Sequence, residues 1–211
     1  MLHFGAVDWK TEVWVNNIKV GEHTGGFTPF TFDITQALKN SENNLVVKVW
    51  DPTEKGTQPR GKQVSNPHGI WYTPVSGIWQ TVWLEFAPEA QIRSFRFYPD
   101  IRTGTVSLAV QFNGTEDFTA EISYQGKPVG EVVCPSCGGF RIFPVPLQEI
   151  HLWEPGCGRL YDITMRFGRD EVQSYFGLRE IALSGRKLLL NGKSVFQRLV
   201  LDQGFYPDGI Y

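Results

Sequence analysis

Alternation of hydrophobic and polar residues is the strongest pattern in this chain, and it is clearest in Ser76–Phe86. This stretch opens with a Ser-Gly turn and continues in β-branched and aromatic residues, which predicts a strand. With a period of two, both of its faces carry large apolar side chains. We therefore expect a central strand that is covered on both sides and ends before Pro88.

The residues before this strand predict a hairpin, two more extended segments and a long loop. Two alternating runs flank Asn16-Asn17, and asparagine tolerates the positive φ of a two-residue turn. Further extended segments are expected at 27–32 and 44–50, with a short helical turn at 33–39. Residues 51–69 are polar and predict a long loop, a kind of segment that often carries function.

The residues after Pro88 predict many short strands separated by turns. Asn113-Gly114 and Gln125-Gly126 are turn signals between consecutive runs. About seven strands are expected, a number and spacing typical of an immunoglobulin-like sandwich: 92–98, 105–112, 118–124, 130–133, 139–145, 160–167 and 172–176. A further hairpin is expected at 188–196, followed by an apolar strand at 198–201.

Composition supports an all-β chain and excludes several partners. Seven Trp, fifteen Phe and seven Tyr accompany 22 Gly and 13 Pro, which suits short strands and tight turns. The net charge of −2 without a basic cluster argues against nucleic acid and against an anionic membrane surface. No apolar run reaches membrane-spanning length. Three cysteines are too few for a disulfide framework, which favours a reducing compartment such as the cytoplasm.

Several ordered motifs together resemble glycoside hydrolase family 2, the β-galactosidase and β-glucuronidase group. The motifs that resemble the family's sugar-binding jelly-roll domain are residues 2–9, 13–17, 25–35 and 77–84. The motifs that resemble its immunoglobulin-like domain are Leu152-Trp153-Glu154-Pro155, Leu160-Tyr161 and 176–179. The motifs that resemble the start of its (β/α)₈ barrel are 190–193 and 196–198.

The resemblance implies three regions: a jelly-roll (galactose-binding-like) sandwich at 1–88, an immunoglobulin-like sandwich at 89–183, and the start of a barrel at 184–211. The family's jelly roll begins earlier than this chain does, and its catalytic glutamates lie in the barrel. The resemblance thus implies an internal fragment of a retaining β-glycosidase, non-catalytic by itself. Where the family reads Arg-Gly-x-Asn-x-His, this chain has Leu201 and Gln203 in place of Asn and His.

The substrate-binding residues implied by the resemblance lie on the loop before Ser76 and at the barrel start. Trp71 occupies a position where the family often has an acidic residue, and an indole face stacks on the apolar face of a sugar ring. Tyr72 and His68 are its neighbours, and Asp202 and Gln203 lie where barrel active sites are built. An alternative for Trp71 is a plug packed beneath the loop. The expected ligand is therefore a carbohydrate, a β-glycoside.

No catalytic pair, metal or cofactor is predicted. Retaining hydrolysis needs two carboxyls roughly 5 to 5.5 Å apart, and none of the acidic residues can be placed as such a pair. Cys134 and Cys137 have the spacing of half a zinc site, but a second close pair is missing. Two other functions stay open, a free-standing carbohydrate-binding module and an adhesive β-sandwich protein. A homo-oligomer is also compatible with the sequence.

Overall fold

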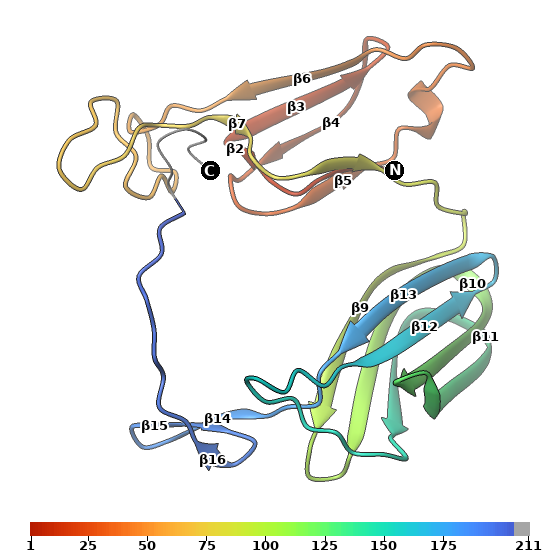
Figure 1. Cartoon of the computed structure of the whole chain (residues 1–211). Coiled ribbons are helices and arrows are strands. Elements are labelled where there is room, and N and C mark those ends of the chain that lie inside the picture. Colours follow the sequence, from red (N-terminus) through yellow and green to blue (C-terminus); the bar gives the residue numbers. More distant parts are fainter. Residues whose placement is uncertain (205–211) are drawn as a thin grey trace. The chain divides into compact units, whose positions relative to one another are not determined.

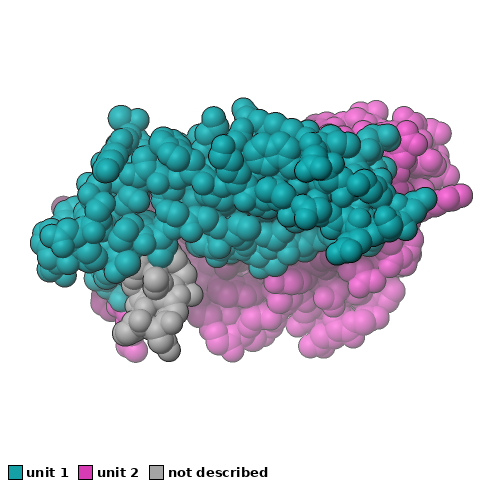
Figure 2. All heavy atoms as spheres, turned by 90° about the horizontal axis from the view of Figure 1, so that it is seen from above, with its two compact units in different colours: residues 1–86, 201–211 teal, residues 87–200 magenta. Residues whose placement is uncertain are grey.

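The computed structural model describes residues 1–204, which form several antiparallel sheets and one 3₁₀ turn, Thr35–Ala37 (Figure 1). The chain forms two compact units, coloured separately in Figure 2. The first is Met1–Phe86 together with the segment that begins at Leu201, and the second is Ala87–Val200. The all-β class predicted from composition is confirmed.

The first unit contains two three-stranded sheets and one two-stranded sheet. The strands are β1 Leu2–Phe4, β2 Val7–Asp8, β3 Lys10–Val15, β4 Ile18–Thr24, β5 Phe30–Phe32, β6 Leu45–Trp50, β7 Gly77–Ile78 and β8 Val82–Leu84. The strand orders in the three sheets are β4-β3-β6, β5-β1-β8 and β2-β7. Alternation in β3 buries Thr11, Val13 and Val15 and leaves Lys10 exposed. The predicted hairpin is confirmed, since Asn16 and Asn17 adopt φ values of 51° and 68°.

The prediction of one central strand at Ser76–Phe86 is wrong. The stretch forms β7 and β8, which pair with different strands and are separated by Trp79–Thr81. β8 is an edge strand, and Trp83, Leu84 and Phe86 are exposed. The alternating pattern is real, but the chain leaves one sheet and enters another after Ile78, which a periodicity of two does not reveal.

The second unit is built on two long strands. β10 (Thr105–Tyr124) pairs with β11 (Lys127–Pro146) along its length, and its other edge pairs first with β9 (Gln91–Asp100) and then with β12 (Tyr161–Phe167). β13 (Asp170–Phe176) follows β12. The core is a single large apolar cluster from these strands, with Phe118, Tyr161, Phe167 and Leu108 among its fully buried members.

The structure has five strands between Gln91 and Phe176 where about seven were predicted. Gln125-Gly126 is a turn, with φ values of 50° and 79°. Asn113-Gly114 is not: the residues form a bulge inside β10, where the register with β11 shifts between Gln111 and Thr115. Positive φ at Gly114 serves a bulge as well as a turn, so the local signal is ambiguous.

The second unit ends in a small sheet, β14 (Ile181–Ser184), β15 (Lys187–Leu190) and β16 (Lys193–Ser194). Its β15–β16 turn confirms the predicted hairpin, with positive φ at Asn191 and Gly192. The strand predicted at 198–201 is wrong, because no described strand pairs with it and Leu199 and Val200 are 78% and 91% exposed. No helix within residues 1–204 is long and apolar enough to span a membrane.

Candidate functional site

The long loop of the first unit, residues 51–76, is held by a buried side-chain amide. Gln63 is 7% exposed; its Oε1 accepts a hydrogen bond from the Val75 amide at 2.7 Å, and its Nε2 donates to the Arg60 carbonyl at 3.1 Å. A parallel bridge joins Gln63 to Tyr72, and the Tyr72 amide donates to the Lys62 carbonyl at 2.8 Å. A loop with little sheet structure is thereby fixed in one conformation.

Two of the predicted site residues, Tyr72 and Gln203, meet in the structure although 131 positions separate them. The Tyr72 hydroxyl donates to Gln203 Oε1 at 2.8 Å, and Lys62 Nζ donates to the same oxygen at 3.2 Å. The segment that begins at Leu201 is thus tied to the loop within the first unit.

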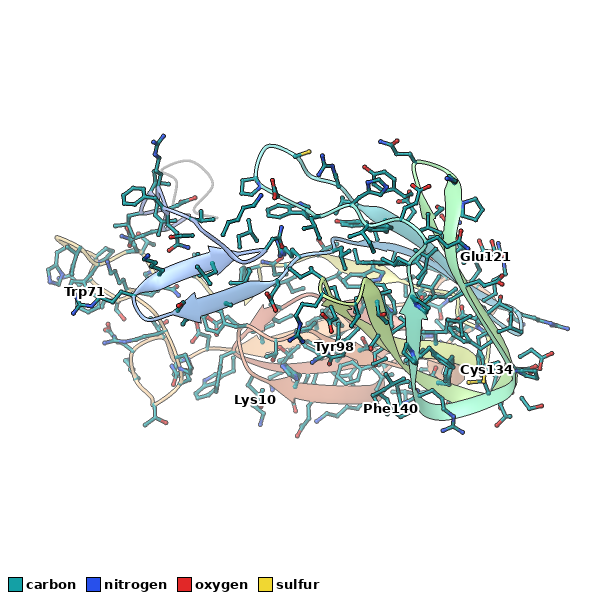
Figure 3. The ribbon with its side chains drawn as sticks, turned by 90° about the horizontal axis from the view of Figure 1, so that it is seen from below. Lys10, Trp71, Tyr98, Glu121, Cys134 and Phe140 are labelled. Atoms are coloured by element: carbon teal, nitrogen blue, oxygen red, sulfur yellow. The ribbon has the colours of Figure 1, made fainter. Side chains whose placement is uncertain are left out.

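The other three predicted residues do not converge on that contact. Trp71 is partly exposed near the outer end of the loop (Figure 3), with the Arg60 guanidinium 5.9 Å from its ring centre. The exposed His68 places Nδ1 2.7 Å from the Asn66 carbonyl oxygen. Asp202 accepts a hydrogen bond from the Gly204 amide at 2.9 Å. The indole is half-buried, so both the stacking surface and the plug packed beneath the loop stay predictions.

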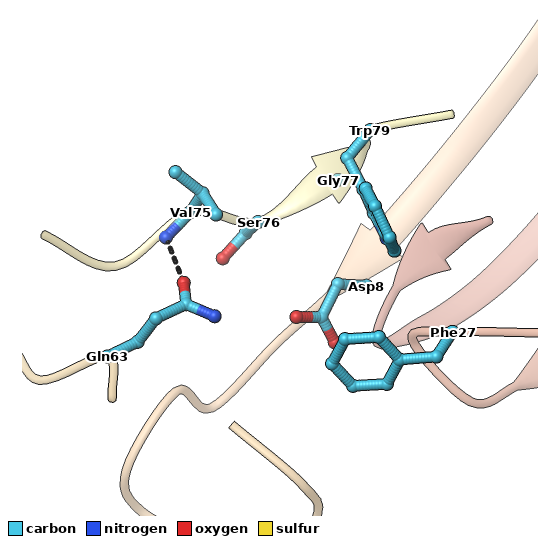
Figure 4. Close-up of a pocket in the computed structure, with 7 residues that line it drawn as sticks. All are labelled: Asp8, Phe27, Gln63, Val75, Ser76, Gly77 and Trp79. Atoms are coloured by element: carbon cyan, nitrogen blue, oxygen red, sulfur yellow. Dashed lines mark hydrogen bonds between the residues drawn. The ribbon is translucent and has the colours of Figure 1, made fainter. Parts of the chain in front are cut away.

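A small cavity lies beside this loop, between β2, β7 and the loop residues (Figure 4). Its volume is about 20 Å³, enough for one water molecule or one hydroxyl group rather than a whole sugar ring. It is lined by Asp8, Phe27, Gln63, Val75, Ser76, Gly77 and Trp79.

Asp8 is the chemically unusual group of this cavity. It is 7% exposed, and its Oδ1 has no hydrogen-bond partner among the described residues. Burial, with a smaller contribution from the Asp51 carboxylate, raises the pKa of Asp8 from 3.8 to about 6. Asp51 is itself bonded, by the Ser76 hydroxyl at 2.6 Å and the Thr53 amide at 2.8 Å. The ionised Asp8 carboxylate can therefore accept a hydrogen bond that no neighbouring group supplies. Once protonated, the carboxyl can donate a hydrogen bond instead.

Aromatic rings and a tightly packed glycine surround Asp8. Trp79 and Phe27 form an edge-to-face pair at 5.9 Å, and Trp79 Nε1 donates to the Gly26 carbonyl at 2.7 Å. A Cβ on Gly26 would lie 2.4 Å from Asp8 Oδ1, so a side chain there would require the Asp8 carboxylate to move. A buried carboxylate in a cavity of this size can accept a hydrogen bond from one hydroxyl group or one water molecule.

The sequence analysis did not single out Asp8, and so missed this cavity. One signal was available: an aspartate between Val7 and Trp9, on a segment with buried neighbours, is an acid where burial is expected. Its proximity to Asp51 and Ser76 depends on the path of the long loop, which sequence alone did not define.

Residues 1–88 match the family described as "Glycosyl hydrolases family 2, sugar binding domain". The first unit thus contains a β domain of the sugar-binding class. Residues 1–88 belong to the sugar-binding domain of glycosyl hydrolase family 2, and the chain as a whole is similar to β-galactosidases and β-glucuronidases.

The relatives are longer enzymes. The chain is 34% identical to the β-galactosidase of Thermoanaerobacter pseudethanolicus over 99% of this chain and 31% of that protein. It is 26% identical to the β-glucuronidase of Canis lupus familiaris, over 93% and 34%. The chain therefore spans about a third of the length of these relatives.

Solved structures show the same fold. The β-glucuronidase of Faecalibacterium prausnitzii matches with a TM-score of 0.70 and 25% identity, over 92% of this chain and 36% of that one. The β-glucuronidase of Ruminococcus gnavus in complex with D-glucuronic acid also gives a TM-score of 0.70, at 24% identity over 92% and 36%. At 24% identity, the similarity to the Ruminococcus gnavus structure shows a shared fold and nothing more.

A double-mutant cycle should detect the bond between Tyr72 and Gln203. We expect Tyr72→Phe and Gln203→Ala each to destabilise the first unit slightly, with a coupling free energy of about 0.5 to 1.5 kcal/mol, the net worth of one hydrogen bond. Denaturant unfolding of the two single variants and the double variant measures it. Strictly additive effects would show that the two side chains do not interact in solution.

Proposed function

We propose that this chain is the non-catalytic β region of a retaining β-glycosidase and that it helps to shape the substrate cleft. In this proposal residues 1–88 are the jelly-roll domain, 89–183 the immunoglobulin-like domain and 184–211 the start of a (β/α)₈ barrel. The match of residues 1–88 to the family's sugar-binding domain supports the first assignment. The names of the relatives, β-galactosidase and β-glucuronidase, support the substrate class.

One observation carries the proposal: the loop at 51–76 is bonded to the segment that follows the second unit. Gln203 accepts hydrogen bonds from both Tyr72 and Lys62, at 2.8 Å and 3.2 Å. Residues expected at the start of a barrel are therefore in contact with the loop that carries Trp71. In the proposal, this connection places Trp71 at the rim of the substrate cleft, where its indole stacks on a sugar ring, while His68 of the same loop and Asp202 beside Gln203 supply polar contacts.

The acidic residues near this loop suit binding rather than catalysis. Glycoside hydrolysis with retention needs a nucleophilic carboxylate and an acid that both reach the substrate. Asp8 is 7% exposed, and the Asp51 carboxylate is already bonded to Ser76 and Thr53. In the proposal, the nucleophile and the acid/base therefore come from outside the described residues.

Trp71→Ala tests the proposed role. In the natural full-length protein, we expect this change to lower kcat/KM for aryl β-glycosides. The expected loss of transition-state stabilisation is roughly 1 to 3 kcal/mol, the scale of one lost substrate contact. The unfolding midpoint should stay unchanged, because the side chain is partly exposed. Ile70→Ala is a matched control, since Ile70 is 66% exposed on the same loop. A Trp71 variant that loses stability but keeps kcat/KM would contradict the proposal, as would hydrolysis by the 211-residue chain alone.

A free-standing binding module is the second candidate, and the Asp8 cavity supports it only as a subsite for a single sugar hydroxyl, since its volume is about 20 Å³. The cavity and its aromatic neighbours Phe27 and Trp79 belong wholly to the first unit. Titration of the 211-residue chain with methyl β-galactoside and methyl β-glucuronide, followed by tryptophan fluorescence, separates the two candidates. Saturable binding that Asp8→Ala abolishes would favour the module, and absence of binding would favour the cleft-shaping role.

A further inference from the structure

A groove of about 660 Å³ lies on the second unit, where residues of β9, β13 and β14 (Figure 1) meet the segment that carries Trp153. Its volume is in the range of small-molecule sites, which are typically about 300 to 1,000 Å³. Four aromatic side chains line it: Phe97, Trp153, Tyr175 and Phe176. The groove belongs wholly to the second unit, so it shares no residue with the Asp8 cavity or with the loop at 51–76.

The aromatic lining of the groove is continuous with the hydrophobic core. Phe176 is 6% exposed, and its ring stacks on Tyr161 at 5.2 Å and on Phe97 at 4.9 Å. Phe97 is half-buried, whereas Tyr175 and Ile181 are 64% and 61% exposed. The groove therefore combines aromatic rings fixed by the core with apolar surface that water covers and that a ligand would bury.

Hydrogen bonds fix the side of the groove that carries Trp153. The Trp153 amide donates to the Leu178 carbonyl at 3.0 Å, and the Asn191 side-chain amide donates to the Trp153 carbonyl at 3.0 Å. Asn191 Oδ1 also accepts a hydrogen bond from the Glu180 amide at 3.0 Å. One asparagine thus ties the segment of Trp153 to the segment of Arg179, which lies between Leu178 and Glu180.

Arg179 is the charged group of the groove. Its guanidinium lies over the Trp153 ring, 4.5 Å from the ring centre, and has no hydrogen bond or ion pair with any residue of 1–204. Stacking on an indole orients the planar guanidinium and leaves its N–H groups free for an acceptor. None of the described residues that line the groove is an aspartate or a glutamate. The groove is therefore complementary to a carboxylate, which a guanidinium binds through paired N–H···O bonds.

We propose that this groove binds a small carboxylic acid with a flat aromatic body, whose carboxylate pairs with Arg179 and whose ring packs on Phe97 and Tyr175. Aromatic rings bury a large apolar area and pack favourably on one another. A sugar fits less well, because the described lining offers one hydroxyl and neither a carboxylate nor a side-chain amide, so most sugar hydroxyls would lose hydrogen bonds to water without replacement. The β-glycosidase role proposed above does not use this groove, and the binding site stands independently of it.

Equilibrium dialysis of the 211-residue chain against 2-naphthoate tests the site, with 2-naphthamide as a neutral probe of nearly the same shape. We expect saturable binding of one naphthoate per chain. The amide should bind about tenfold more weakly or worse, because only the ionised acid forms the charge-assisted pair with the guanidinium. Added salt should weaken binding of the acid more than binding of the amide.

Two arginine variants separate the proposed contact from a general effect of charge. Arg179→Met should weaken naphthoate binding about tenfold or more and leave naphthamide binding nearly unchanged. Arg186→Met is the matched control, because Arg186 is exposed in the same unit and does not line the groove. Tyr175→Ala, a change at an exposed position, should weaken both probes, since it removes a packing surface that they share. Circular dichroism and the unfolding midpoint check that each variant is folded.

Four results would overturn the proposal: no saturable binding of naphthoate, equal affinity for the acid and the amide, no effect of Arg179→Met in a folded variant, or an equal loss in Arg186→Met. Tighter binding of methyl β-glucuronide than of naphthoate would overturn the ligand class, because it would show that sugar hydroxyls are recognised. The comparisons between ligands use the wild-type chain, so they decide the matter even if Arg179→Met does not fold.

Discussion

Replacing Asp8 with asparagine is expected to stabilise the protein at pH 8 by about 2 to 3 kcal/mol more than at pH 4. The pKa of Asp8 is raised by burial from 3.8 to about 6. A raised pKa means that the folded state prefers the protonated carboxyl, so the stability that depends on this proton is fully present below pH 3.8 and is lost as the pH rises through 6. An asparagine side chain carries no charge at either pH and avoids this loss.

Denaturant unfolding of the wild type and of Asp8→Asn at pH 4, 6 and 8 measures the difference. Asp33→Asn is a control with the opposite sign, because hydrogen bonds from the Thr35 hydroxyl and amide lower the pKa of Asp33. That carboxylate contributes stability above its unfolded-state pKa, so Asp33→Asn should destabilise the protein at neutral pH. A gain from Asp8→Asn that is equal at all three pH values would mean that Asp8 does not titrate with a raised pKa.

Phe118→Ala is expected to have the largest effect on stability, a loss of about 3 to 5 kcal/mol in the second unit. The ring is fully buried and packs edge-to-face on Phe112, at 5.0 Å between centroids, and stacked on Phe143, at 5.1 Å. Removing it leaves a cavity in the middle of β10 that rigid strands on both sides cannot fill.

Phe86→Ala is the matched control, since Phe86 is 97% exposed and its loss should change stability by no more than about 0.5 kcal/mol. Hydrogen exchange of the β10, β11 and β12 amides reports on the second unit directly. Equal losses of protection in the two variants would show that Phe118 is not a core residue in solution.

Local signals predicted several elements of this fold correctly. Asn16-Asn17, Gln125-Gly126 and Asn191-Gly192 all occupy turns with positive φ. Turn formation depends on the φ and ψ preferences of a few adjacent residues, which the sequence states directly. The extended segment predicted at 44–50 likewise corresponds to β6, because its alternation of apolar residues lies within one short strand.

The candidate site was predictable only in part. Tyr72 and Gln203 were both named on the strength of a family resemblance, and the structure brings them to 2.8 Å. Trp71, His68 and Asp202 stay predictions for substrate contact. Asp8 was missed, because what makes it unusual is its burial and its nearness to Asp51, and residues 43 positions apart share no local pattern.

The sequence by itself determined the all-β class, the turns at Asn16-Asn17, Gln125-Gly126 and Asn191-Gly192, and the family, since each depends on local backbone preference or on ordered motifs. Only the tertiary structure decided whether a stretch of alternating apolar and polar residues forms one strand or divides between two sheets. Ser76–Phe86 divides between two sheets, and Asn113-Gly114 is a bulge within β10 rather than a turn. The physical reason is that strand pairing is non-local: hydrogen-bond partners from distant segments determine whether an extended, apolar stretch continues, bends or ends.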